Sequence, residues 1–199
     1  EAEADRVIDA SGLYVAPGFI DVHSHSGPGL ASPELSHGEP LLAMGLTTVF
    51  INPDGGGAVD LAEQRGELLR DGLGLNVAQL VPHGSVRRAV IGTADRHAST
   101  SELDAMRGLV RAGMSEGAWG LSSGTFYVPG SYAPPEEIEE LGKEVAPFGG
   151  AYTSHYRDES TYSVGLIAAV DEVINVGRVA KIPAVLTHVK ALGPFVWGY

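Results

Sequence analysis

Short apolar runs alternate with helix-like segments along almost the whole chain, and this alternation restricts the fold more than any other feature. The runs expected to form strands lie at residues 19–23, 46–51, 75–81, 118–121, 150–153 and 182–186. The segments expected to form helices lie at residues 32–44, 59–70, 100–114, 134–146 and 162–180. The strand candidates are mostly continuous apolar runs, as expected when both faces of a sheet are covered. The pattern predicts an α/β protein with a parallel sheet and helices outside it.

A doubly wound open sheet and a (β/α)8 barrel both fit this pattern. No Gly-x-Gly-x-x-Gly follows the first repeat strand and no P-loop is present, which weakens the nucleotide-binding version. Polar residues at the expected carboxyl ends of the strands favour the barrel, because barrel active sites are built there. These residues are His23, His25, Asp54, His83, His155 and His188. The other two histidines, His37 and His97, are expected at the surface.

Composition narrows the class of function. The 199 residues are 44% hydrophobic and 19% charged, which is typical of a globular chain. The formal net charge is −12 and there is no basic run, which argues against nucleic acid or an anionic membrane surface as a partner. No apolar stretch approaches the roughly 18 residues of a membrane span. The chain has no cysteine, so any metal ligands must be His, Asp, Glu or a modified Lys.

His23 and His25 lie one residue apart at the end of a strand candidate. Side chains alternate along a strand, so both imidazoles should point the same way and could hold one metal ion. The alternative is two exposed histidines in a loop. Asp54 likewise has two interpretations, a metal ligand or a turn residue in the sequence Asn-Pro-Asp-Gly.

Six motifs resemble those of a known family. PGFIDVHSH at residues 17–25 is similar to the opening metal motif of the amidohydrolase superfamily. The later motifs resemble one branch, the N-acyl-D-amino-acid deacylases, also called D-aminoacylases. These motifs are GLTTV at 45–49, HGSVR at 83–87, GLSSGTFYVPGSYA at 120–133, YTSHYRDE at 152–159 and LTHVK at 186–190. The resemblance covers nearly the whole chain and implies a metal-dependent hydrolase of linear amide bonds.

The resemblance also implies roles for individual residues. His155 and His188 match two histidines that hold a tightly bound Zn2+, and His23 and His25 match a pair that holds a second, weaker metal position. Asp54 stands where the family has a metal-binding cysteine, and a carboxylate could bridge two divalent ions in its place. In addition, Tyr127 and Lys190 match groups that contact the scissile carbonyl of a small N-acyl amino acid substrate.

Supporting roles are less determined by the sequence. The histidine ligands need partners for their other ring nitrogens. Asp21, Asp158 and Glu159 are candidates, and a solvated or helix-capping role fits each of them equally well. Arg157 is a candidate substrate-binding residue, with Arg87 and Tyr132 as further candidates for the pocket lining. Ordinary surface salt bridges are the alternative for these arginines.

The chain is expected to be a fragment. Residues 17–199 should form about six βα units of an incomplete barrel, and residues 1–16, with a strand at 7–10, should be the remnant of a small N-terminal β domain. The resemblance places the general-base aspartate after an eighth strand, so we expect it to lie beyond Tyr199 in a missing C-terminal part. The fragment alone should then be inactive. No signal-peptide pattern is present, which favours a cytoplasmic protein.

Alternative functions stay open at this point. Within the superfamily, the enzyme could be a cyclic amidase of the dihydroorotase or hydantoinase type, or an isoaspartyl dipeptidase. The long match at residues 120–133 argues against both. A non-catalytic metal-binding relative is the alternative from another class.

Overall fold

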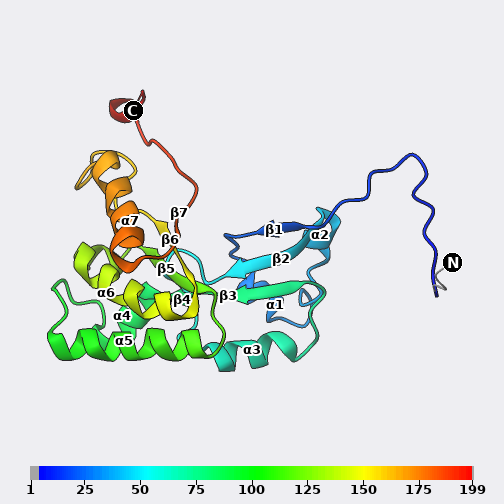
Figure 1. Cartoon of the computed structure of the whole chain (residues 1–199), viewed down its shortest axis with the longest axis horizontal. Coiled ribbons are helices and arrows are strands. Elements are labelled where there is room, and N and C mark those ends of the chain that lie inside the picture. Colours follow the sequence, from blue (N-terminus) through cyan, green and yellow to red (C-terminus); the bar gives the residue numbers. More distant parts are fainter. Residues whose placement is uncertain (1–4, 199) are drawn as a thin grey trace.

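The computed structural model describes residues 5–198, and every strand within them pairs in parallel with its neighbours (Figure 1). The first sheet has the order β1-β2-β3 and the second the order β4-β5-β6-β7. The strands are β1 (Phe19–Asp21), β2 (Leu46–Ile51), β3 (Asn76–Gln79), β4 (Val81–Pro82), β5 (Gly120–Gly124), β6 (Ala151–His155) and β7 (Ala184–Leu186).

One run of chain joins the two sheets. β3 pairs with β2, β4 pairs with β5, and only Leu80 separates β3 from β4. The Leu80 amide donates to the carbonyl of Ile51 at 3.2 Å, and the Trp119 amide donates to the carbonyl of Gln79 at 2.9 Å. The single strand expected at 75–81 is therefore divided, because its two halves pair with different neighbours. The strands follow one another in chain order, and the predicted partial (β/α)8 barrel is confirmed.

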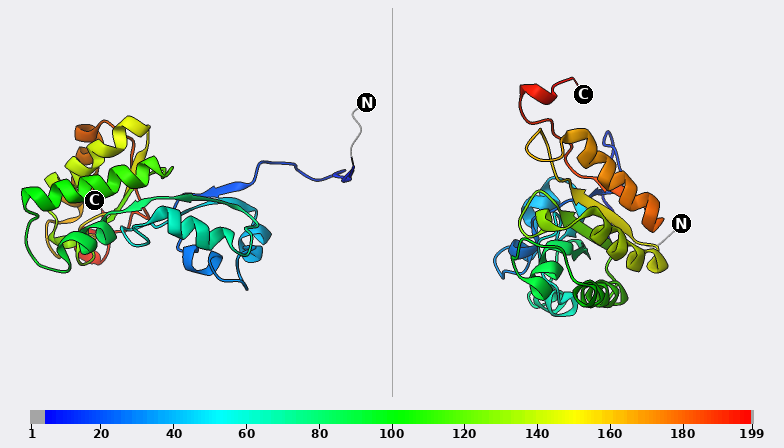
Figure 2. Two further views of the ribbon diagram at one scale, coloured as in Figure 1. Left: turned by 90° about the horizontal axis from the view of Figure 1, so that it is seen from below. Right: turned by 90° about the vertical axis from the view of Figure 1, so that its left-hand side faces the viewer.

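Helices follow the strands and cover the sheets from outside (Figure 2). They are α1 (Gly27–Leu30), α2 (Glu39–Ala43), α3 (Leu61–Leu69), α4 (His83–Ile91), α5 (Thr100–Ser115), α6 (Pro135–Val145) and α7 (Leu166–Ala180). A small core formed by Leu30, Val49, Ile51, Leu68 and Leu75 packs α1 and α3 against β2. A larger core packs α4 to α7 against the second sheet. These two cores fix the strand ends that carry the site.

Several expected helices differ from the structure. The helix expected at 32–44 is reduced to a turn at residues 32–37 followed by the short helix α2. Pro40 explains the break, since proline disrupts a helix interior but fits the first turn, where α2 places it. α4 was not expected from the sequence. Ser99 caps α5, in a capping box with Glu102.

The apolar spacing within residues 162–180 predicts a buried face of Leu166, Ile167, Val170, Val173 and Ile174, and α7 buries only part of it, through Leu166 and Val173. Ile167 and Ile174 are 52% and 43% exposed. The helix instead packs through small residues, since a Cβ on Gly177 would lie only 2.8 Å from the Cβ of Ala184 in β7. Small side chains allow α7 to approach the sheet closely. The spacing of large apolar residues does not indicate this close approach, because it depends on the small residues of the helix.

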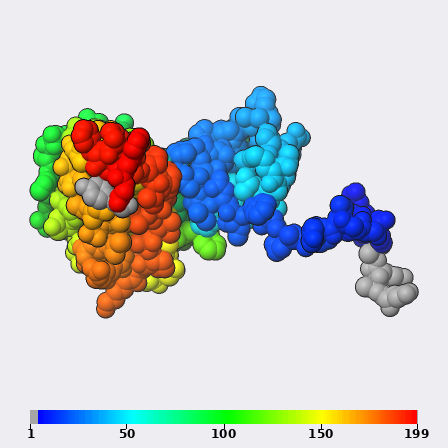
Figure 3. Space-filling model, turned by 90° about the horizontal axis from the view of Figure 1, so that it is seen from above, coloured from blue at the N-terminus to red at the C-terminus, as the bar shows by residue number. Residues whose placement is uncertain are grey.

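Residues 5–18 form neither helix nor strand and project from the body of the molecule (Figure 3). The strand expected at 7–10 is not formed, because no described strand pairs with this segment, and Val7 is 86% exposed. The expectation that residues 1–16 belong to a small β domain stays a prediction, and its first four residues lie outside the described part. No helix among the described residues is long and apolar enough to cross a membrane.

Candidate metal centre

Four histidines gather around Asp54 at the carboxyl ends of the strands. His23 and His25 lie in the loop after β1, and Asp54 lies in the turn after β2. His155 is the last residue of β6, and His188 follows β7. Because parallel strands bring their carboxyl ends to one edge, residues far apart in the sequence meet here.

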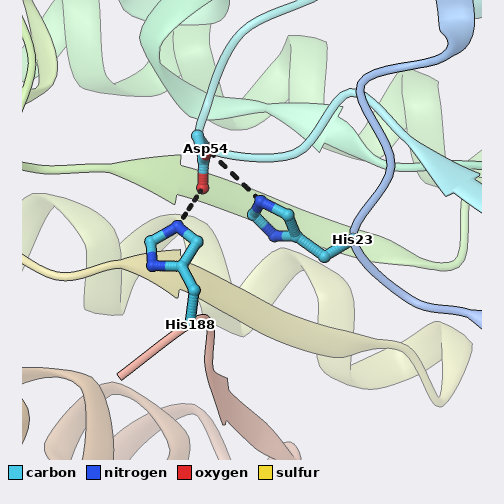
Figure 4. A group of neighbouring side chains, drawn as sticks. All are labelled: His23, Asp54 and His188. Carbon is cyan, nitrogen blue, oxygen red and sulfur yellow. Dashed lines mark ion pairs between the residues drawn. The ribbon is translucent and has the colours of Figure 1, made fainter. Parts of the chain in front are cut away.

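The Asp54 carboxylate lies between two histidine pairs (Figure 4 draws His23, Asp54 and His188). Its Oδ2 atom is 3.4 Å from Nε2 of His23 and 3.2 Å from Nε2 of His25. The other oxygen, Oδ1, is 3.6 Å from Nε2 of His188 and 3.9 Å from Nδ1 of His155. One carboxylate oxygen therefore faces each pair, which is the arrangement of a ligand that bridges two positions.

These separations fit a metal site better than a network of hydrogen bonds. Two ligands each bound to a tetrahedral zinc ion at about 2.0–2.2 Å lie about 3.4 Å apart. The observed distances of 3.2–3.9 Å scatter around that value, and all but the 3.2 Å contact of His25 are long for hydrogen bonds. Among the described residues, Nδ1 of His23, Oδ1 of Asp54 and Nε2 of His155 are buried without a hydrogen-bond partner. The donor set, nitrogen and carboxylate oxygen, is suitable for a divalent ion.

Two of the four histidines, His23 and His155, are held in the protonation state that metal binding requires. Burial lowers the pKa of His23, and the nearby Asp54 carboxylate only partly offsets this effect. Burial likewise lowers the pKa of His155, against smaller opposing effects of Glu159 and Asp54. Both imidazoles are therefore neutral at neutral pH, with a lone pair available for a metal ion.

The turn that carries Asp54 is fixed by its own sequence. Asn52 and Asp54 have left-handed backbone angles, with φ of 63° and 54°, which Asn and Asp tolerate better than most residues. The Asn52 side chain donates to the carbonyl of Leu80 at 3.1 Å and exchanges hydrogen bonds with Gln64. Gly55 must be glycine, since a Cβ there would lie 2.9 Å from the amide nitrogen of Gly124. These contacts set the direction of the carboxylate.

Two polar side chains flank the cluster. The Tyr127 hydroxyl is 3.2 Å from Nδ1 of His155, and Nζ of Lys190 is 2.8 Å from Oε1 of Glu159. Burial, assisted by the Asp54 charge, raises the pKa of Tyr127, so its hydroxyl keeps its proton. The contact with Glu159 raises the pKa of Lys190, so its amine stays charged. Both groups are therefore hydrogen-bond donors at the edge of the cluster.

A family model described as "Amidohydrolase family" matches residues 6–173. The chain belongs to the amidohydrolase family. The resemblance read from the motifs is thereby confirmed, and the histidine cluster lies where barrels of this kind carry their active sites.

The relatives of this amidohydrolase chain include deacylases. A D-aminoacylase from Alcaligenes xylosoxydans xylosoxydans is 34% identical over 97% of this chain and 44% of its own length. A solved D-aminoacylase structure superimposes with a TM-score of 0.80 at 29% identity, over 92% of this chain and 42% of that one. An N-acyl-D-glutamate deacylase from Bordetella bronchiseptica, solved with zinc and a phosphonate inhibitor, gives 0.79 at 31% identity and covers the same shares. The chain thus spans less than half the length of these relatives.

Three acidic residues of this amidohydrolase chain were candidates for orienting the histidines, and they behave differently. Asp21 accepts a hydrogen bond from the backbone amide of His23. Asp158 accepts hydrogen bonds from four backbone amides of the loop before α7. Only Glu159 faces the cluster, with Oε1 at 3.2 Å from Nε2 of His155. Together with His155 and His188, Glu159 also forms a second group that could hold a metal ion.

Other candidates lie away from the cluster. His83 is fully buried, with Nε2 at 2.9 Å from Glu137, although it follows a strand as the ligands do. Arg87 forms a buried ion pair with the same Glu137. The Arg157 guanidinium binds Glu172 and the carbonyls of Ser131 and Ala133. His37 and His97 are exposed, as expected.

Proposed function

We propose that this chain is the metal-binding part of a zinc-dependent amidohydrolase that removes the acyl group from N-acyl-D-amino acids. The observation that carries the proposal is the Asp54 carboxylate, which has one oxygen facing His23 and His25 and the other facing His155 and His188. The relatives named above, a D-aminoacylase and a zinc-containing N-acyl-D-glutamate deacylase, support the substrate class and the metal.

We assign the tighter zinc position to His155, His188 and Asp54, and a second divalent position to His23, His25 and Asp54. When bound, such an ion lowers the pKa of water to about 7 and polarises a carbonyl. A D-aminoacylase studied for the role of its binuclear metal centre supports two positions, one activating and one attenuating. The carboxylate of Asp54 belongs to both sets because each of its oxygens faces a different pair.

Tyr127 and Lys190 supply donors to the substrate in this proposal. Both groups keep their protons at neutral pH. The Tyr127 hydroxyl lies 3.2 Å from Nδ1 of His155, and Nζ of Lys190 lies 2.8 Å from Oε1 of Glu159. Donors directed at a developing oxyanion are each worth about 3–4 kcal/mol in characterised enzymes. We therefore propose that they bind the scissile carbonyl oxygen and stabilise its negative charge.

Three expectations from the sequence stay predictions. A substrate contact from Arg157 would require it to give up contacts that now hold Glu172 and two carbonyls. The general-base aspartate is expected outside these residues. The cytoplasmic location is likewise untested.

The proposal is tested with the protein expressed from its complete gene and loaded with zinc. Release of free amino acid from N-acetyl-D-leucine and N-acetyl-L-leucine is followed in parallel with the ring opening of dihydroorotate and of a hydantoin, each of which gives an N-carbamoyl amino acid. Hydrolysis of the D-enantiomer, with little turnover of the L-enantiomer or the cyclic amides, supports the proposal. Preferential turnover of a cyclic amide would identify a cyclic amidase instead, and zinc binding without any turnover would identify a non-catalytic relative.

A further inference from the structure

A cavity of about 590 Å³ opens beside the metal centre. One side of the cavity is formed by α1 and the segment that carries His25. The other side is formed by the turn after β2 and by α3. His25, Asp54 and Tyr127 form part of its wall. A molecule held at the metal centre would therefore direct one of its substituents into this cavity.

The wall away from the metal centre is apolar in character. Pro28, Ala31, Pro53 and Ala58 contribute carbon atoms to it. Glycines widen it, and Gly57 has to be glycine because a Cβ would lie 2.4 Å from Oδ1 of Asn52. Apolar walls favour an aliphatic or aromatic substituent of a ligand, because each such contact removes apolar surface from water.

The amide side chains of the wall are already satisfied. Asn52 donates to Oε1 of Gln64 at 2.9 Å, and Gln64 donates back to Oδ1 of Asn52 at 2.8 Å. Gln79 also donates to Oε1 of Gln64 at 2.8 Å. A ligand carboxylate entering the cavity could obtain only the second N–H of Gln64 from these amides without breaking this network.

The charge of the wall also opposes an anionic substituent. None of the described residues that line the cavity is a lysine or an arginine. Glu67 of α3 lies in the wall and has no ion-pair partner among the described residues. A carboxylate here would lose water, gain no cation and approach the Glu67 charge.

We propose that this cavity receives an uncharged, apolar substituent of the substrate and so selects neutral over acidic N-acyl-D-amino acids. The inference rests on the proposed deacylase function and deepens it, because two of the curated relatives are an N-acyl-D-aspartate and an N-acyl-D-glutamate deacylase. Their identities to this chain, 35% and 34%, equal or slightly exceed the 34% of the D-aminoacylase, so identity does not decide among them. The lining of the cavity does.

The first test compares kcat/KM for N-acetyl-D-leucine and N-acetyl-D-glutamate in the zinc-loaded protein expressed from its complete gene. We expect the neutral substrate to be favoured by at least about tenfold, since a buried carboxylate without a partner is costly. Glu67→Lys should raise the ratio of acidic to neutral kcat/KM by about two- to fivefold, as for an exposed charge pair. Asp71→Lys makes the same charge change outside the cavity and should leave the ratio unchanged.

A second comparison identifies which part of the substrate enters. Ala58→Leu narrows the cavity, so it should lower kcat/KM for N-acetyl-D-leucine relative to N-acetyl-D-alanine if the amino-acid side chain enters. It should instead lower kcat/KM for N-hexanoyl-D-alanine relative to N-acetyl-D-alanine if the acyl chain enters. Circular dichroism checks that the variant is folded. An effect on the N-hexanoyl substrate alone, or an unchanged pattern in both arms, would contradict the inference, because selection between neutral and acidic amino acids requires the amino-acid side chain to enter.

The inference and the proposed function fail in different ways. Equal or better turnover of N-acetyl-D-glutamate by the wild type, or equal effects of Glu67→Lys and Asp71→Lys, overturns the inference and leaves a deacylase. Absence of any deacylation overturns the proposed function. In that case titration calorimetry of the same two ligands with the zinc-loaded protein decides the inference, which predicts tighter binding of N-acetyl-D-leucine.

Discussion

The buried ion pair between Arg87 and Glu137 joins α4 to α6, and its loss should weaken the fold strongly. Both side chains are almost completely buried, and Glu137 also accepts a hydrogen bond from His83 at 2.9 Å. Glu137→Gln keeps the shape but leaves the Arg87 cation without a counter-charge. Breaking a buried pair in this way costs about 3–5 kcal/mol. We expect the free energy of unfolding to fall by that amount.

Urea unfolding followed by circular dichroism measures this change. Glu116→Gln is the matched control, because Glu116 pairs with Arg65 and both side chains are nearly half exposed, at 47% and 44%. Exposed pairs are worth about 0.2–1 kcal/mol. A loss below about 1 kcal/mol for Glu137→Gln, or equal losses for the two variants, would refute the reasoning.

The same pair predicts how stability changes with pH. Burial alone would raise the pKa of Glu137, but the hydrogen bonds and charges of His83 and Arg87 outweigh it and hold the pKa below its ordinary value. The stabilisation that ionised Glu137 provides is therefore complete above about pH 4.3, the pKa of a glutamate in the unfolded chain. It is lost as the pH falls through the lower pKa that Glu137 has in the folded protein. The unfolding free energy of Glu137→Gln should decline less steeply than that of the wild type between about pH 5 and pH 3.

Three further changes test local parts of the structure. Ser99→Ala removes the cap of α5, where Ser99 and Glu102 form a capping box, and should lower the unfolding free energy by about 1 kcal/mol in the same urea assay. Gly55→Ala places a Cβ 2.9 Å from the Gly124 amide nitrogen at a φ of 71°, so it should displace the neighbouring turn and reduce the zinc retained after dialysis. Lys190→Met removes a proposed oxyanion donor and should lower kcat on N-acetyl-D-leucine about 100- to 1000-fold with zinc content unchanged, whereas lost zinc would contradict that role.

The sequence predicted the order of strands well because apolar runs and glycine or proline breaks mark them directly. β2 has the expected bounds, and each other strand expected after residue 17 is present with shifted ends. The division of residues 75–81 into β3 and β4 could not be predicted, because it depends on which neighbouring strands pair with each half. The strand expected at 7–10 has no partner among the described residues, so local β-propensity was insufficient there.

The residues of the site were predictable from their place at strand ends, but their contacts were not. The position after a strand did not distinguish His83 from His155, since burial against Glu137 is a property of the packed helices. Glu159 was one of three equal candidates, and only the structure directs its Oε1 atom towards His155 and Lys190.

Zinc binding by the wild type and by Asp54→Ala tests the central claim most directly. Metal content after dialysis, measured by mass spectrometry, and zinc affinity, measured by competition with a chelator, give the result without reference to activity. We predict that the wild type retains zinc. Asp54→Ala should lower the zinc affinity by more than about 100-fold, because removing a residue that only hydrogen-bonds to a metal ligand already costs about 10–100-fold. Asp71→Ala, an exposed acid outside the cluster, should retain the wild-type affinity. A wild type without zinc, or an Asp54→Ala variant with unchanged affinity, would contradict a metal centre built around Asp54.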